Sequence, residues 1–235
     1  MDVYPSDVFI ALHDWNVRRR MEADFRSETN PYGPASDVER RKEDALFALL
    51  SDRRYRSALD GGCAAGNLAR RVAPLCDRLL AMDISETAVW RAMVNLADAP
   101  NVTFACRNLR TAEAPGAFDL ILLSDVLPFL DAGPRFDAAL HAFGARMANA
   151  LAPDGRLVLI SEIDSSGTYG AARRHETAFR AVSGLLFRQS LVTGGGAGPR
   201  HALVLFQQAA AAAKPATPVR GIPFGKPGLT QSSSR

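Results

Sequence analysis

The stretch LDGGCAAGNLARRV, residues 59–72, combines an aspartate, glycines and small side chains between two apolar runs. A turn of this kind exposes backbone N–H groups, and the start of the following helix adds a positive dipole, so the turn can bind a nucleotide-type ligand. Read as the dinucleotide fingerprint G-x-G-x-x-G, the stretch has Cys63 where a glycine must let the pyrophosphate approach. NAD is therefore disfavoured.

Read as Asp-x-Gly-x-x-x-Gly, the same stretch aligns Asp60, Gly62 and Gly66. An acid beside the turn suits S-adenosylmethionine, which has no pyrophosphate but carries a methionyl ammonium. Asp83 ends the next apolar run, 79–82, where this topology places a carboxylate on ribose hydroxyls. The alternative is that the aspartates cap helices and the glycines only form turns. The position of both acids after successive strands favours cofactor binding.

Short β-type runs alternate with helical segments along most of the chain. This alternation predicts a parallel sheet with helices on both faces. The connector at 194–199 is too short for a crossover helix, so the sheet should end in an antiparallel hairpin. The seven predicted strands are 57–61, 78–83, 101–106, 118–124, 156–162, 185–192 and 201–207. The predicted helices are 6–27, 37–51, 67–76, 85–97, 134–151 and 170–184.

Length and composition indicate one globular domain. Of the 235 residues 47% are hydrophobic, which is enough for an α/β core. The three cysteines show neither zinc-site nor disulfide spacing, and we find neither a secretory leader nor a membrane span, so we expect a soluble cytoplasmic protein without a metal. Basic clusters at 18–20, 40–42 and 53–56 are more typical of solvated helix faces than of a nucleic-acid site.

Several motifs together resemble the class I S-adenosylmethionine-dependent methyltransferases and, more narrowly, the NodS-like family, whose namesake N-methylates a chitooligosaccharide precursor of nodulation factors. The motifs are NPY at 30–32 with VERRK at 38–42, RYRSALDGGCAAGNL at 54–68, CDRLLAMDIS at 76–85, NVTF at 101–104, FDLILLSDVLPFL at 118–130 and GRLVLI at 155–160. The resemblance implies an α/β fold with a Rossmann-like seven-stranded methyltransferase sheet. We expect an N-terminal helical lid over 1–52, a cofactor-binding core over 53–208 and a disordered tail over 209–235.

The resemblance also implies cofactor-binding roles for particular residues. Ala64 stands at the central glycine of the family's turn, and Asn108 stands at an acid that faces the adenine amino group. The carbonyl oxygen of Asn108 can accept that hydrogen bond. The residues expected to bind S-adenosylmethionine are Asp60, Gly62, Cys63, Ala64, Gly66, Asp83, Ile84, Asn108, Leu109 and Ser124.

The methyl acceptor is expected at the ends of the fourth and fifth strands. Asp125 and Glu162, with Asp164 beyond them, would form a negative rim that attracts an amine. Asp125, Glu162 or His175 can take the proton of that amine if they lie within reach. The alternatives are a helix cap at Asp125, loop carboxylates that point apart, and a surface helix position for His175.

These features predict a methyltransferase that acts on a small molecule, with an amino sugar or other amine as the first choice of acceptor. In-line transfer from a sulfonium mainly requires alignment of the acceptor and exclusion of water. Trp15, Phe25 and Tyr32 either belong to the lid or staple the N-terminal helix to the sheet. The open alternatives are an O-methyltransferase, a nucleic-acid methyltransferase that uses the basic clusters, and a non-catalytic cofactor-binding scaffold.

Overall fold

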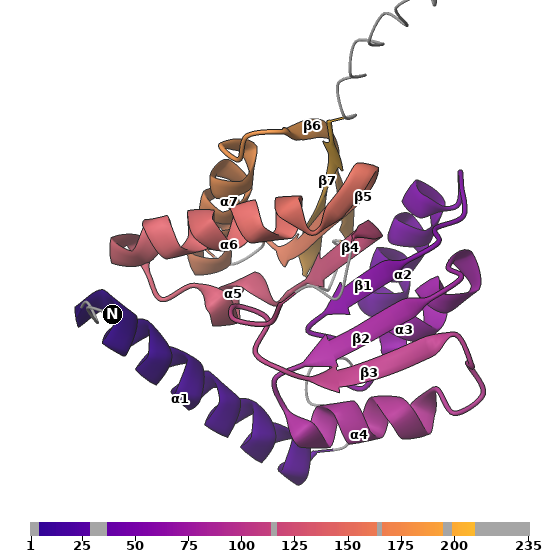
Figure 1. The fold of residues 1–235 in the computed structure, drawn as a ribbon, viewed down its shortest axis with the longest axis horizontal. Helices are drawn as coiled ribbons and strands as arrows, with labels where there is room; N and C mark the ends of the chain where they lie inside the picture. Colours follow the sequence, from indigo (N-terminus) through magenta and orange to yellow (C-terminus); the bar gives the residue numbers. More distant parts are fainter. Residues whose placement is uncertain (1–4, 29–36, 114–116, 164–165, 195–198, 210–235) are drawn as a thin grey trace, which may run out of the picture.

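Seven strands form one twisted sheet in the order β3-β2-β1-β4-β5-β7-β6 (Figure 1). The computed structural model describes residues 5–28, 37–113, 117–163, 166–194 and 199–209. Strands β1 to β5 pair in parallel, and β7 runs antiparallel to its neighbours β5 and β6, so the predicted sheet with a C-terminal antiparallel hairpin is confirmed. The strands are β1 Ala58–Gly61, β2 Leu79–Asp83, β3 Val102–Cys106, β4 Phe118–Ser124, β5 Leu151–Glu162, β6 Leu185–Gly194 and β7 Arg200–Gln208.

Helices cover both faces of the sheet, and each face has its own buried cluster (Figure 1). Alternate residues of β4 point to opposite faces: Leu120 and Leu122 join one cluster, whereas Ile121 and Leu123 join the other. Because both faces are covered, the central strands are continuously apolar. The helices on the first face are α2 Asp37–Leu50, α3 Asn67–Val72 and α4 Glu86–Asn95. Those on the second face are α5 Leu127–Leu130, α6 Asp137–Asn149 and α7 Ser166–Arg180.

Helix α1, Pro5–Ser27, lies apart from these layers and passes across the end of the sheet where the parallel strands finish (Figure 1). Its polar contacts reach loops that follow the strands. His13 Nε2 lies 3.0 Å from the carbonyl oxygen of Phe129, and the hydroxyls of Ser85 and Thr87 donate to Glu22 over 2.7 and 2.6 Å.

Several predicted boundaries need correction. The helix predicted at 67–76 ends at Val72 and continues as a 3-10 turn, Ala73–Leu75, because Pro74 has no N–H to donate. The helix predicted at 134–151 stops at Asn149, and β5 begins at residue 151 rather than 156, because Leu151 pairs with Phe118. Helix α5 was not predicted, and residues 210–235 of the expected tail lie outside the described part.

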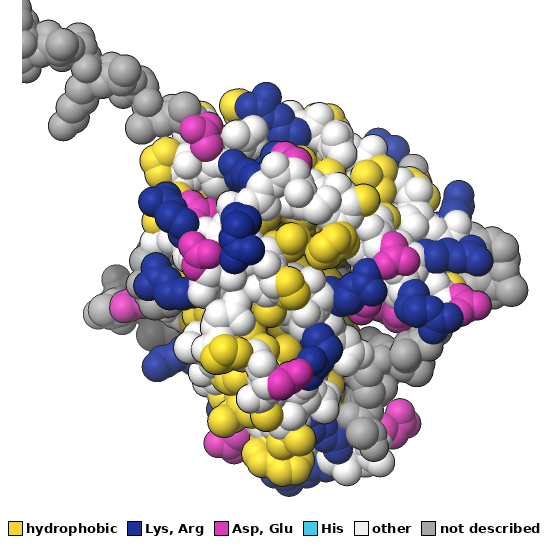
Figure 2. Space-filling model, turned by 90° about the vertical axis from the view of Figure 1, so that its right-hand side faces the viewer, with side chains coloured by type: hydrophobic (Ala, Val, Ile, Leu, Met, Phe, Trp, Pro, Cys, Tyr) yellow, Lys and Arg dark blue, Asp and Glu magenta, His cyan; other side chains and the backbone are white. Residues whose placement is uncertain are grey.

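Basic side chains are spread over the surface rather than gathered in one patch on the face that Figure 2 shows, where acidic side chains stand between them. Two arginines of the 53–56 cluster form ion pairs: Arg54 with Asp77 over 3.2 Å and Arg56 with Asp119 over 3.3 Å. This pairing agrees with the interpretation of the cluster as a solvated surface.

Candidate active site

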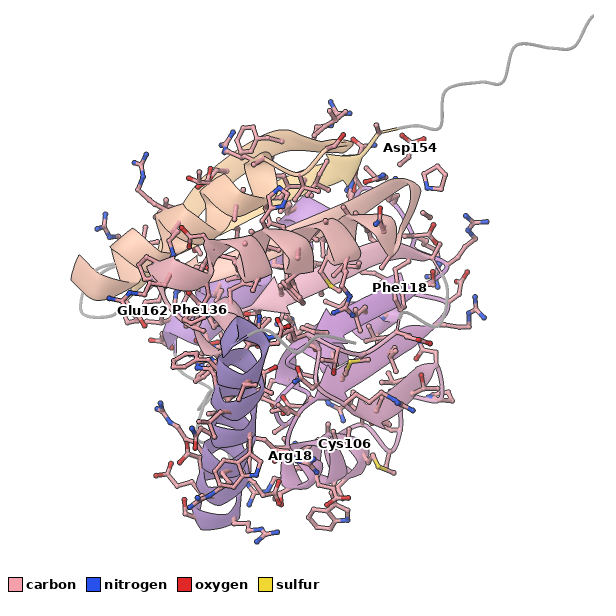
Figure 3. All side chains as sticks on the ribbon, turned by 60° about the vertical axis from the view of Figure 1, so that its left-hand side comes forward. Arg18, Cys106, Phe118, Phe136, Asp154 and Glu162 are labelled. Atoms are coloured by element: carbon pink, nitrogen blue, oxygen red, sulfur yellow. The ribbon has the colours of Figure 1, made fainter. Side chains whose placement is uncertain are left out.

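A cavity of about 490 Å³ lies under α1, at the carboxyl ends of the parallel strands. The inner face of α1 supplies an apolar roof through Val17, Met21 and Phe25. Figure 3 shows Glu162 at this end of the sheet, with Phe118 and Asp154 at the opposite end. All the predicted site residues except Gly66 line the cavity, so residues from distant parts of the sequence are brought to one place.

The turn between β1 and α3 requires small residues because its backbone is left-handed at three positions. Gly62, Ala64 and Gly66 have φ values of 83°, 49° and 85°. A Cβ atom on Gly62 would lie 2.7 Å from Val126 Cγ2, and one on Gly66 would lie 2.6 Å from Leu96 Cδ1. Gly66 thus shapes the turn and begins α3 rather than lining the cavity.

The first amides of this turn bind the neighbouring strand. The N–H groups of Gly62 and Cys63 both donate to the carbonyl oxygen of Met82, over 2.8 and 3.0 Å, and Ala64 N donates to Asp83 Oδ2 over 3.0 Å. The expectation that these N–H groups face a ligand is wrong for these three positions, since each amide already has a protein partner. The groups beside the turn that can recognise a cation are therefore the carboxyl groups of Asp60 and Asp83.

Asp60 is the most deeply buried of these acids. Its side chain lines the cavity, its residue is 1% exposed, and Oδ2 has no hydrogen-bond partner among the described residues. Burial, with a smaller contribution from the charge of Asp83, raises the pKa of Asp60 to about 7. Because an unpaired buried carboxylate is costly, Asp60 either takes up a proton or needs a cation beside it, and the cavity leaves room for a cation.

Asp83 ends β2 and holds the turn. Its Oδ2 accepts from Ala64 N, and its Oδ1 accepts from Ser85 N over 2.9 Å. Burial raises the pKa of Asp83, while the hydrogen bonds from Ser85 and Ala64 oppose that shift. Each carboxylate oxygen retains a further lone pair, so the side chain can accept two ribose hydroxyls without leaving its place.

Asn108 follows β3 and is already engaged on both sides. Its Nδ2 donates to Asp14 Oδ2 over 2.8 Å, and its Oδ1 accepts from Arg110 N over 2.9 Å. Arg110 Nε also lies 3.0 Å from Asp14 Oδ2, so α1 is tied to this loop by an ion pair. One lone pair on Oδ1 remains for the adenine amino group. Ile84 and Leu109 line the same part of the cavity, and Leu109 also packs in the buried cluster of the second face.

Asp125 lies at the other end of the cavity, directly after β4, with a left-handed φ of 51°. Its Oδ1 accepts from Glu162 N over 3.1 Å, and its Oδ2 accepts from Ser124 Oγ over 3.3 Å and from Lys42 Nζ over 2.9 Å. Asp125 does not cap the next helix, whose N-cap is Val126. Strain held in place by several bonds is typical of functional sites.

Lys42 of α2 is a buried cation at this end. Its Nζ bridges Asp125 and Glu39, the latter at 2.7 Å. Burial lowers the pKa of Lys42, but the two carboxylates outweigh burial and the net shift is upward. Lys42 is therefore an ammonium that forms an ion pair with Asp125, not a base.

His175 is buried, being 1% exposed, so the alternative of a surface helix histidine is wrong. It lies one helical turn before Phe179 and therefore on the same inward face of α7. Its Nε2 lies 2.9 Å from Asp131 Oδ2, and Arg174 also pairs with Asp131. Burial, and then the charge of Arg174, lower the pKa of His175 to about 4, so the ring is neutral at pH 7.

The aromatic residues expected in the lid differ from one another in their burial. Phe25 is buried and lines the cavity, as a lid residue should. Trp15 is 52% exposed and faces away from the cavity, with the Arg19 guanidinium 4.9 Å from its ring. Tyr32 and Asp164 lie outside the described residues.

Three polar residues that sequence reasoning missed also line the cavity: Asp14, Lys42 and His201. Lys42 stands at the end of VERRK, a motif already noted, and His201 opens the last strand of the predicted hairpin at the site edge. Asp14 carries no signal in the sequence, because its role depends on how α1 packs.

Neither a metal centre nor a membrane-spanning helix is found among the described residues. Among those residues, no group of three or more His, Cys, Asp or Glu side chains is arranged to hold a metal ion. None of the described helices has the length and apolar character needed to cross a bilayer.

Solved methyltransferase structures share this fold. N-methyltransferase NodS from Bradyrhizobium japonicum WM9, in complex with S-adenosyl-L-homocysteine, has a TM-score of 0.71 and 22% identity, covering 82% of this chain and 98% of that chain. Magnesium protoporphyrin IX methyltransferase (ChlM) from Synechocystis PCC 6803, with bound S-adenosylmethionine, has a TM-score of 0.61 and 18% identity, covering 84% and 97%. The fold is that of the Rossmann-like methyltransferases.

The sequence matches the family Nodulation protein S (NodS) over residues 18–192, and the chain belongs to that family. Nodulation protein S of Sinorhizobium fredii is 29% identical over 133 residues, which are 56% of this chain and 60% of that protein. The protein of the same name from Bradyrhizobium diazoefficiens is 31% identical over 136 residues, 57% and 61% of the two chains. The matches thus span about three fifths of the length of these curated relatives.

Proposed function

We propose that the protein is an S-adenosylmethionine-dependent N-methyltransferase that acts on a small molecule, an amino sugar or another amine. The observation that carries the proposal is the buried Asp60 carboxyl, which has an oxygen without a partner in a cavity that it shares with Asp83. A methionyl ammonium supplies the missing partner, and the adjoining ribose supplies hydroxyls for Asp83. The relative crystallised with S-adenosyl-L-homocysteine supports this choice of ligand.

The charges at the far end of the cavity support an amine as the acceptor. Seven acidic side chains line the cavity, among them Glu39, Glu43, Asp125 and Glu162, against two cationic side chains in the described lining, Lys42 and Arg107. A net negative cavity attracts a cationic acceptor and repels an anionic one. Asp125 and Glu162 are proposed to receive the acceptor's ammonium, and one of the two cavity histidines, His175 or His201, to take its proton.

When bound, S-adenosylmethionine supplies the methyl group on an activated sulfur. The protein must then hold the acceptor nitrogen in line with that methyl group and keep water out. Phe25, Met21 and Val17 form the apolar wall that excludes water on the α1 side. Asp60 and Asp83 fix one end of the cofactor, and Asp125 fixes the acceptor at the other end.

The organisation of the chain is part of the same proposal: a lid over 1–52, a core over 53–208 and a tail from 209. The three cysteines are free thiols, which supports a reducing compartment such as the cytoplasm.

Two measurements test the proposal. Thermal denaturation and titration calorimetry with S-adenosylmethionine and S-adenosyl-L-homocysteine should show stabilisation and binding. A screen of amines, amino sugars and phenols should then show a methyl mass increment on an amine. Neither stabilisation nor binding with either ligand would refute the cofactor, and methylation of phenols alone would refute the amine. Filter binding of RNA and DNA at two salt concentrations should show no tight salt-dependent complex.

A further inference from the structure

His201 is the second residue of β7, lines the cavity and is 4% exposed. Its Nε2 lies 3.9 Å from Asp125 Oδ2, and its Nδ1 is buried with no hydrogen-bond partner among the described residues. The Nε2 separation is longer than the 2.7–2.9 Å or so of an N–H donated to a carboxylate. Nε2 is therefore beside Asp125 without being bonded to it.

The other histidine that lines the cavity, His175, differs from His201 in its hydrogen bonding. His175 Nε2 lies 2.9 Å from Asp131 Oδ2, a distance at which the ring donates that hydrogen, and its remaining nitrogen, Nδ1, is buried. His175 is held by its ion-pair network on α7. Of the two rings, His201 is the one whose Nε2 is open to a ligand.

The ionisable groups around His201 come from each element packed on β7. Strand β5 places Glu162 directly opposite His201 in the antiparallel register, and β6 places the uncharged Thr193 there. Asp125 directly follows β4, and α2 contributes Glu39, Lys42 and Glu43 to the same cavity. Carboxylates outnumber cations in this set, so a positive charge that forms on the ring has compensation nearby.

The 3.9 Å separation of His201 Nε2 and Asp125 Oδ2 leaves room for an ammonium group that contacts both atoms. An ammonium nitrogen placed about 2.9 Å from both atoms can donate one hydrogen to each acceptor once the Ser124 hydroxyl, the more distant of the two donors already on Oδ2 at 3.3 Å, turns away. Lys42 holds the Asp125 side chain in place through their 2.9 Å ion pair, so Lys42 acts as a positioning residue for this arrangement.

We infer that His201 is the base that removes the proton from the acceptor amine, an inference that rests on the proposed N-methyltransferase function. The acceptor R–NH3⁺ gives one proton to Nε2, which leaves R–NH2 with a free electron pair and His201 as an imidazolium beside Asp125. That electron pair then forms the N–C bond to the methyl group, and the electron pair of the broken C–S bond stays on sulfur. The step requires the neutral ring to carry its hydrogen on Nδ1.

The first test reads the tautomer without relying on activity. In protein labelled with 15N-histidine and loaded with S-adenosyl-L-homocysteine, NMR at pH 8 should show an unprotonated Nε2 and a protonated Nδ1 for His201. The chain has four histidines, so loss of one set of signals in His201→Gln identifies the ring. The opposite tautomer, with hydrogen on Nε2, overturns the inference.

The second test is the pH profile of methyl transfer to D-glucosamine. His201→Gln should lower kcat/KM by about 100-fold at pH 7, and the loss should shrink as the pH approaches the pKa of the amine, because solvent then removes the proton. Binding of S-adenosyl-L-homocysteine should be unchanged. His141→Gln, an exposed position on α6, should keep the wild-type profile.

Two outcomes of the second test count against His201. A loss of kcat/KM in His201→Gln that is the same at every pH indicates a structural role. If the loss of kcat/KM shrinks with rising pH in His175→Gln instead, then His175 of α7 is the base. Absence of transfer by the wild-type protein, with S-adenosyl-L-homocysteine bound, counts against the amino sugar in the proposed function; the tautomer then decides the role of His201.

Discussion

The amide of Ala64 donates to Oδ2 of Asp83 across 3.0 Å, so the acid after β2 holds the turn after β1. The same carboxylate accepts from Ser85 N at the start of α4. One side chain therefore joins the two loops that form the cofactor end of the cavity. A substitution there must affect both the shape of the turn and the groups offered to a ribose.

Asp83→Ala is expected to weaken binding of S-adenosyl-L-homocysteine by about 100-fold, since hydrogen bonds to a charged acceptor contribute about 1.5–3 kcal/mol each. The fold should remain, because the sheet core does not depend on this side chain. Titration calorimetry measures the dissociation constant. Asp77→Ala, an exposed aspartate just before β2, is the matched control and should bind as the wild type does. An unchanged dissociation constant in Asp83→Ala would contradict the assignment.

Asp60→Asn is expected to stabilise the ligand-free protein as the pH rises. The folded pKa of about 7 is above the ordinary 3.8, so below pH 3.8 the carboxyl is protonated in both states and burial has no ionisation cost. Between these values wild-type stability falls by about 1.4 kcal/mol for each pH unit, to a full cost on the order of 4 kcal/mol above pH 7. The asparagine lacks this cost at every pH.

Urea denaturation at pH 4, 6 and 8 measures this difference. The advantage of Asp60→Asn over the wild type should grow with pH, and S-adenosyl-L-homocysteine should no longer stabilise the variant, because the cation has lost its partner. A constant difference across the three pH values would show that Asp60 is already ionised in the ligand-free fold.

Gly66→Ala is expected to destabilise the protein by about 1–3 kcal/mol, because alanine is strained at a φ of 85° and its Cβ would lie 2.6 Å from Leu96 Cδ1. Chemical denaturation measures the loss. Gly170→Ala on α7 is the control, since its Cβ would meet nothing within 4 Å, and it should raise stability by about 0.5–1 kcal/mol. Equal stability of the Gly66 variant and the wild type would mean that the turn relaxes.

The parallel sheet with its C-terminal antiparallel hairpin, and the proposed cofactor end of the site, follow from features that are local in the sequence. A parallel strand with Asp60 one residue before its end and another that ends in Asp83 must bring both acids to one edge, wherever the surrounding helices lie. Gly62 and Gly66 could be placed in a turn for the same reason. The resemblance also identified the family, which the match over residues 18–192 confirms.

Features that depend on packing between distant elements could not be predicted. The spacing of Leu46 and Leu50 marks the inward face of α2 and places Lys42 on it, but the ion pair that stabilises this buried ammonium is with Asp125, 83 positions away. Asp14 meets Asn108 only because α1 crosses the sheet edge. The position of His175 could have been found, because the aromatic Phe179 four residues later marks the inward face of α7.

Asp125→Asn is expected to lower kcat for methyl transfer to D-glucosamine by about 10- to 100-fold and to leave binding of S-adenosyl-L-homocysteine within about twofold of the wild type. A carboxamide keeps the shape of the side chain but cannot balance the charges of Lys42 and an incoming ammonium. Initial rates at saturating donor, with calorimetry on the same samples, separate the two effects. Asp98→Asn, which removes an exposed ion pair with Arg70, should change neither quantity. Equal activity of the Asp125 variant and the wild type would remove Asp125 from the acceptor site, and a weakened cofactor complex would place it at the other end of the cavity.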